Sequence, residues 1–119
     1  MSTGQNSASS LFSSICKPEY QKKLNDLIAQ KQATVFSTTY CPFCVKATRI
    51  LDRNNVEYSE VKLDEMYGED QMEIANCVYG EERRFVPYIY YDQKRLGSYG
   101  ELHQLDQEGK VVNSATNQQ

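Results

Sequence analysis

The stretch Thr34–Leu51, TVFSTTYCPFCVKATRIL, constrains the fold of this chain more than any other. It predicts a short strand of β-branched and aromatic residues over Thr34–Ser37, then a polar turn, then a helix that opens on the motif CPFC at residues 41–44. Two cysteines three residues apart at the start of a helix lie one turn from each other, on the same side. The stretch therefore predicts a redox-active dithiol held between a strand and a helix.

The two sulfurs of this dithiol have different expected roles. Cys41 falls at the helix N-terminus, where unpaired backbone N–H groups and the helix dipole favour an anion such as a thiolate. We therefore expect Cys41 to attack and Cys44 to resolve the mixed disulfide that forms. Pro42 suits the first helical position, because the N–H that proline lacks would be unpaired there.

A zinc site is the alternative interpretation of a CxxC motif. Zinc usually takes four ligands, and the chain has no second CxxC and only one histidine, His103. We therefore expect no metal, and we interpret the motif between a strand and a helix as typical of a thioredoxin-like redox fold.

Composition limits the size of the protein and the classes of partner. The 119 residues are enough for one domain, and 39% hydrophobic and 24% charged residues are typical of a soluble globular chain. A net charge of −3 argues against a large basic surface for nucleic acid. No stretch approaches the roughly 18 apolar residues of a membrane span. We expect a monomer that binds neither nucleic acid nor membrane.

The first 16 residues are rich in serine and carry neither a positive n-region nor a continuous apolar core, so they do not predict a secretory signal. We expect a disordered N-terminal tail at 1–16, a domain at 17–112 and a flexible tail at 113–119, in a cytoplasmic protein; mitochondrial targeting by the N-terminal tail is the alternative. The four cysteines should then be mostly reduced. Cys77 is predicted to be a small buried hydrophobe, and Cys16 an exposed thiol.

The remaining pattern predicts an α/β fold. Strand, helix and strand at this spacing imply a parallel, right-handed βαβ unit. The whole order implies a four-stranded mixed β-sheet flanked by helices. The other expected elements are a helix from Pro18 to about Gln30, a strand over 56–63, a helix over 69–79 that ends at Gly80, a hairpin over 88–97 and a last helix opened by Gly100.

Three motifs together resemble the dithiol glutaredoxins: TYCPFC at 39–44, Val86-Pro87, and LGSYGEL at 96–102. The similarity covers about residues 19–112. It implies a glutathione-dependent thiol–disulfide oxidoreductase in which Cys41 attacks glutathione mixed disulfides and protein disulfides, with glutathione as the co-substrate. It also implies a cis Pro87. The positions that match the family's glutathione groove are Tyr40, Arg84, Val86, Pro87, Gly97, Ser98, Gly100 and Glu101.

The chain also departs from the family pattern. Thr38 replaces a lysine that many members carry, Ser98 replaces the second glycine of a pair, and Gly100 takes a position that usually supplies a helix cap. The alignment of Gln71 with the family's groove glutamine stays open. Two alternatives therefore remain: a carrier of a glutathione-ligated [2Fe–2S] cluster, against which Pro42 argues, and a dithiol reductase served by a reductase partner in place of glutathione.

Overall fold

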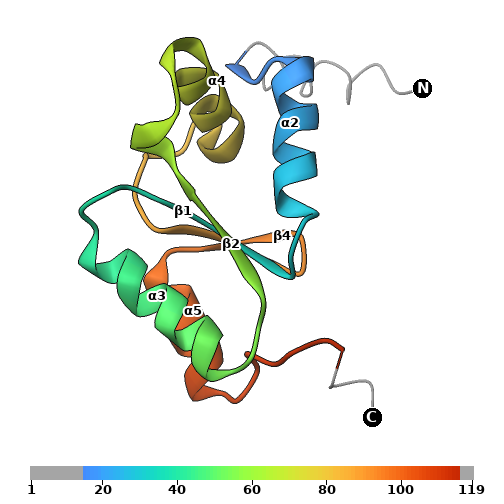
Figure 1. The fold of residues 1–119 in the computed structure, drawn as a ribbon, viewed down its shortest axis with the longest axis vertical. Coiled ribbons are helices and arrows are strands. Elements are labelled where there is room, and N and C mark those ends of the chain that lie inside the picture. Colours follow the sequence, from blue (N-terminus) through green and yellow to red (C-terminus); the bar gives the residue numbers. More distant parts are fainter. Residues whose placement is uncertain (1–14, 116–119) are drawn as a thin grey trace.

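The computed structural model describes residues 15–115 (Figure 1). The predicted α/β fold, a four-stranded mixed sheet flanked by helices, is confirmed. In chain order the elements are α2 (Pro18–Ile28), β1 (Ala33–Ser37), α3 (Pro42–Arg53), β2 (Tyr58–Lys62), the short 3₁₀ helix η1 (Leu63–Glu65), α4 (Gly68–Tyr79), β3 (Tyr88–Tyr91), β4 (Lys94–Gly97) and α5 (Tyr99–Gln107).

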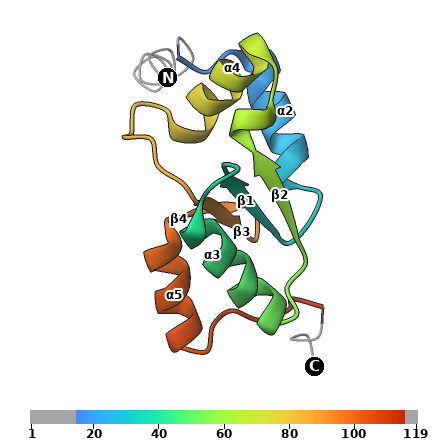
Figure 2. The same cartoon turned by 60° about the vertical axis from the view of Figure 1, so that its left-hand side comes forward.

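The sheet has the strand order β2-β1-β3-β4. Strand β1 pairs with β2 in parallel and with β3 antiparallel, and β3 and β4 form the predicted antiparallel hairpin. Helices α2 and α4 lie on one side of the sheet, and α3 and α5 lie on the other (Figures 1 and 2). The central position of β1 brings the start of α3 to one end of the sheet, and the CPFC motif lies there.

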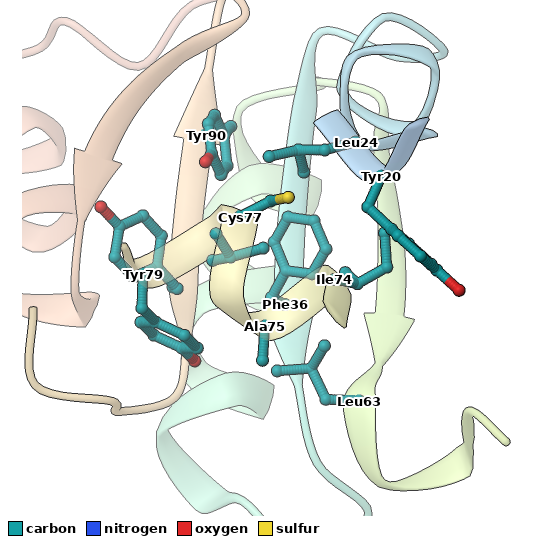
Figure 3. Close-up of a cluster of buried hydrophobic side chains, with 11 residues drawn as sticks. Tyr20, Leu24, Phe36, Leu63, Ile74, Ala75, Cys77, Tyr79 and Tyr90 are labelled. Carbon is teal, nitrogen blue, oxygen red and sulfur yellow. The ribbon is translucent and has the colours of Figure 1, made fainter. Parts of the chain in front are cut away.

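Strand β1 is buried on both of its faces, and all five of its residues are inaccessible to solvent. Phe36 joins the cluster under α2 and α4 (Figure 3), whereas Val35 joins the cluster under α3 and α5. A strand covered on both sides has no reason to alternate polar and apolar residues. This explains why the neighbouring residues Val35 and Phe36, which face opposite sides of the sheet, are both apolar.

Strand β2 lies at the edge of the sheet and is shorter than the predicted 56–63. Tyr58 packs against the cluster under α3 and α5, and Val61 packs against the one under α2 and α4. Both sides of this edge strand are therefore partly covered, which is why its sequence does not alternate cleanly. Val56 is buried before the strand begins.

The predicted start of the last helix is wrong by one residue, and so is the predicted loss of its cap. Helix α5 begins at Tyr99, with Ser98 as the N-cap residue. The Ser98 side chain accepts a hydrogen bond from the Gly100 N–H, and the Glu101 carboxylate accepts one from the Ser98 N–H at 2.8 Å. This reciprocal pair is a capping box, so the serine that replaces a glycine supplies the missing cap.

The prediction that the cysteines are mostly reduced is wrong. Cys16 is joined to Cys77 and Cys41 to Cys44, so no cysteine within residues 15–115 is free. Cys77 is buried as predicted, but as half of a disulfide, and Cys16 is half-buried beside it rather than an exposed thiol.

Of the two predicted tails, residues 1–14 and 116–119 lie outside the described part of the chain. Residues 15 and 16, which were predicted to end the N-terminal tail, lie inside it, and Cys16 packs against the cluster under α2 and α4. Within residues 15–115 no helix has the length and apolar character needed to cross a membrane.

Candidate active site

The CPFC motif places its two sulfurs differently. Cys41 is the N-cap residue of α3 and is half-buried, whereas Cys44 is only 1% exposed. The Cα atoms of the two residues are 5.2 Å apart, and the sulfurs are joined as a disulfide. The Cys44 N–H donates to Cys41 Sγ at 3.1 Å. This donor and the helix N-terminus would stabilise negative charge on Cys41 once the disulfide is reduced.

The turn that leads into the dithiol is held by the carboxylate of Asp64, which lies in η1 directly after β2. The backbone N–H of Thr39 donates to both oxygens of Asp64, at 3.0 and 3.2 Å. Hydrogen bonds from the Thr39 side chain and backbone lower the pKa of Asp64. Asp64 follows β2, so the parallel pairing of β1 and β2 brings it to this turn. The ends of β1 and β2 together therefore fix the turn that precedes Cys41.

We expect the stability of the fold to fall in acid partly through Asp64 and Glu101. Hydrogen bonds from Ser98 lower the pKa of Glu101, as Thr39 lowers that of Asp64. A carboxylate with a depressed folded-state pKa stabilises the fold fully above its unfolded-state pKa, roughly 4. That contribution is lost as the pH falls through the lower folded-state value.

Denaturant unfolding between about pH 6 and pH 3 checks this expectation. The double variant Asp64→Asn/Glu101→Gln should lose less stability over this range than the unmodified protein does. An identical pH dependence in both proteins would show that neither carboxylate contributes.

A hollow of about 460 Å³ lies next to the dithiol turn. Thr38, three residues before Cys41, lines one side of it. The loop before β3 contributes Arg84, Phe85 and Val86 to the wall, and η1 and α4 contribute the rest. The residues from η1 and α4 are Leu63, Gln71, Met72, Ala75 and Tyr79.

Contacts from α4 fix the loop that carries Arg84 and Val86. The Arg84 guanidinium donates to Asn76 Oδ1 at 2.5 Å, and the Tyr79 hydroxyl donates to the carbonyl of Phe85. Burial raises the pKa of Tyr79 to about 12, so the hydroxyl keeps its proton at neutral pH. The Val86–Pro87 peptide bond is cis, as expected, and Pro87 is buried.

A second hollow, of about 520 Å³, lies over the hairpin and the start of α5. Gly97, Ser98 and Glu101 line it, and Phe85 lines both hollows. The Phe85 ring stacks on Tyr88, with ring centroids 5.2 Å apart. The amide of Ser98 already holds the Glu101 carboxylate, so a ligand carboxylate that approaches this amide would meet one that is already bound.

The structure brings together most of the predicted groove residues, but not all of them. Arg84 and Val86 lie in the first hollow, and Gly97, Ser98 and Glu101 in the second. Three predicted groove residues line neither hollow: Tyr40, which is 93% exposed, Pro87, which is buried, and Gly100.

Gln71 is the residue that sequence reasoning left open, and the structure places it in the first hollow. Its side-chain amide donates to the Leu63 carbonyl at 2.9 Å. The signal for it in the sequence was the uncertain alignment with the family's groove glutamine. Lys46, the nearest lysine after the motif, lies over the Phe43 ring at 4.9 Å and lines a different hollow beside Tyr99 and the exposed His103.

Among residues 15–115 no three His, Cys, Asp or Glu side chains gather closely enough to hold a metal ion. A CxxC at the N-terminus of the helix after a central strand of a mixed four-stranded sheet defines a thiol–disulfide oxidoreductase of thioredoxin-like fold. Comparison with known proteins narrows this class.

The glutaredoxin family model matches residues 33–96. The chain is 30% identical to glutaredoxin-2, mitochondrial, of Bos taurus over 110 residues, which are 92% of this chain and 68% of that protein. It is 31% identical to the Mus musculus protein of the same name over 91 residues, 76% of this chain but only 57% of that protein's length. The chain therefore belongs to the glutaredoxin family, whose members are thiol oxidoreductases with redox-active cysteines.

Solved structures agree on the fold. A wheat glutaredoxin superimposes with a TM-score of 0.71 at 26% identity, over 79% of this chain and 88% of that one. A buckwheat glutaredoxin–glutathione complex superimposes with a TM-score of 0.69 at 23% identity, over 78% of this chain and 84% of that one.

Proposed function

We propose that this protein is a dithiol glutaredoxin that uses glutathione to reduce protein disulfides and glutathione mixed disulfides through Cys41. The observation that carries the proposal is the half-buried Cys41 at the N-terminus of α3, three residues after Thr38, which lines a hollow together with Arg84 and Val86. The buckwheat protein of the same fold, which was solved as a glutathione complex, also motivates it.

The chemistry is thiol–disulfide exchange at Cys41. Its thiolate attacks the glutathione sulfur of a mixed disulfide, the substrate leaves as a thiolate, and glutathione is left bonded to Cys41. A second glutathione thiolate then attacks that sulfur, releasing glutathione disulfide and the Cys41 thiolate. With a protein disulfide as substrate, Cys44 displaces the substrate instead and a Cys41–Cys44 disulfide forms, which is the bond that the structure holds.

Arg84 is the proposed partner for a glutathione carboxylate. The tripeptide carries two carboxylates, and the cation that many family members have at position 38 is a threonine here. Arg84 is the cation among the residues that line the hollow beside the dithiol turn, and Asn76 holds its guanidinium in place. A guanidinium recognises a carboxylate well, because its planar donors match the two oxygens.

Arg84→Gln should raise the KM for glutathione roughly two- to fivefold, the range expected for an exposed ion pair of up to about 1 kcal/mol. The matched control is Arg83→Gln, which removes the same charge from a neighbouring exposed residue that does not line the hollow. Steady-state kinetics with hydroxyethyl disulfide would measure both variants. Equal effects would indicate a general charge effect and no specific contact.

One observation favours a second candidate, a dithiol reductase that takes electrons from a protein reductase instead of glutathione. In the capping box the Ser98 N–H already donates to the Glu101 carboxylate, so this N–H is not available to a ligand carboxylate in the second hollow. Amide NMR shifts during a glutathione titration would discriminate between the candidates. Shifts at Arg84, Val86 and Glu101 support glutathione; their absence at millimolar glutathione supports the reductase partner.

A further inference from the structure

The second disulfide joins two parts of the chain that are far apart in sequence. Cys16, just before α2, is bonded to Cys77 in α4 across a separation of 61 residues, with Cα atoms 4.6 Å apart. The two sulfurs differ in access, because Cys16 is half-buried and Cys77 is only 2% exposed. Figure 3 shows Cys77 in the buried cluster beside Leu24 of α2.

Other contacts hold the same two helices together without the disulfide. Lys17 Nζ lies 3.1 Å from a Glu73 carboxylate oxygen, and the Tyr20 hydroxyl donates to Asp70 Oδ1 at 2.8 Å. These bonds would keep Cys16 and Cys77 side by side after reduction. Cys16 Sγ also lies 3.4 Å from Gln21 Oε1, which is an acceptor for the thiol of the reduced form. The pair can therefore open and close without unfolding the domain.

Helix α4 connects this pair to the hollow beside the dithiol turn. Asn76, adjacent to Cys77, holds the Arg84 side chain. The Cys77 carbonyl accepts a hydrogen bond from Arg95 Nη2 at 3.1 Å, and Arg95 lines the second hollow. The disulfide fixes Cys77 and with it the segment of α4 that binds Arg84 and Arg95. Arg84 lines the first hollow and Arg95 lines the second.

We propose that Cys16 and Cys77 form a second thiol–disulfide site, separate from the CPFC dithiol, that is oxidised by small-molecule disulfides and braces α4 against α2. The accessible Cys16 thiolate attacks a disulfide RSSR and releases one RS⁻. The Cys77 thiolate then displaces the second RS⁻ and closes the Cys16–Cys77 bond. Two electrons pass from the pair to RSSR. Reduction runs in reverse, with thiol attack at Cys16.

The test uses the full chain with the active-site thiols removed, Cys41→Ser/Cys44→Ser, so that only the second pair responds. The protein is equilibrated without denaturant in glutathione disulfide or in dithiothreitol, quenched in acid, and then alkylated in denaturant so that the buried Cys77 also reacts. We expect a peptide linked through Cys16 and Cys77 in the oxidised sample, and two alkylated cysteines in the reduced one. Reduction should lower Tm by roughly 15–20 °C, as expected when a loop of this length is opened.

Adding Cys16→Ser to this background provides the control, because it removes the accessible sulfur and leaves the buried Cys77 in place. Its Tm should match the reduced protein and stay the same in both buffers. Hydrogen exchange of α4 amides should be faster in the reduced protein and in this variant.

Three results would overturn the proposal: thiols that stay alkylatable in glutathione disulfide, dimers linked through Cys16, or a bond that dithiothreitol reduces only in denaturant. None of these measurements depends on glutathione-driven turnover, so the proposal can fail while the proposed function stands, and the reverse.

Discussion

Replacing Cys41 by serine should reduce the turnover of a glutathionylated peptide to the rate of the enzyme-free control, because Cys44, the other sulfur at the start of α3, is only 1% exposed. Cys44→Ser is the matched variant. It removes the buried sulfur and leaves the Cys41 thiolate able to exchange glutathione, so deglutathionylation should continue. The same variant should lose reduction of protein disulfides, since Cys44 resolves that intermediate.

Steady-state rates for both variants on both substrates check this prediction. Circular dichroism should show that each variant is folded, because a serine hydroxyl is close in size to a thiol. Appreciable activity of Cys41→Ser on the glutathionylated peptide would refute the assignment of Cys41 as the attacking sulfur.

Gly97→Ala should lower the free energy of unfolding by about 1–3 kcal/mol, through strain at a positive backbone angle. Gly97 has a φ of +124°, and a methyl group there would lie 2.9 Å from the Glu101 carboxylate oxygen that completes the capping box. The substitution therefore strains the backbone and also disturbs the start of α5. We expect a rise in the KM for glutathione as well, since Gly97 lines the second hollow.

Gly109→Ala is the control for this effect. Its φ of +71° is also positive, but a methyl group there would meet nothing within 4 Å. Gly109→Ala should lower the free energy of unfolding by about 1–2 kcal/mol, through backbone strain alone. Urea unfolding of the two variants gives the comparison. An equal loss of stability in both would mean that the contact with Glu101 is unimportant.

The sequence was sufficient to predict the sheet and the dithiol because both depend on local patterns. The β-branched and aromatic residues of Thr34–Ser37 predicted a strand, and β1 covers these residues. The spacing of Cys41 and Cys44, with Pro42 between them, indicated the start of a helix, and α3 begins there. Positions such as Arg84 came from family motifs, and the structure supplied what those motifs do not contain, namely the bond to Asn76.

What could not be predicted depends on side chains that meet only after folding. Ser98 was noted only as a departure from the family's glycine pair, yet its hydroxyl and amide form a cap with Glu101 that requires the particular geometry of the α5 start. The pairing of Cys16 with Cys77 depends on how α2 packs against α4, and neither helix encodes its partner in its own periodicity. Gln71 reaches the hollow only because α4 turns that side of the helix toward Thr38.

The most direct test of the central claim is to trap the mixed disulfide. Reduced Cys44→Ser protein is mixed with a glutathionylated peptide, quenched in acid and mapped by peptide mass spectrometry. We predict one glutathionyl group, bonded to Cys41, together with release of the peptide as a free thiol. An unmodified Cys41, or the peptide rather than glutathione on Cys41, would contradict the account.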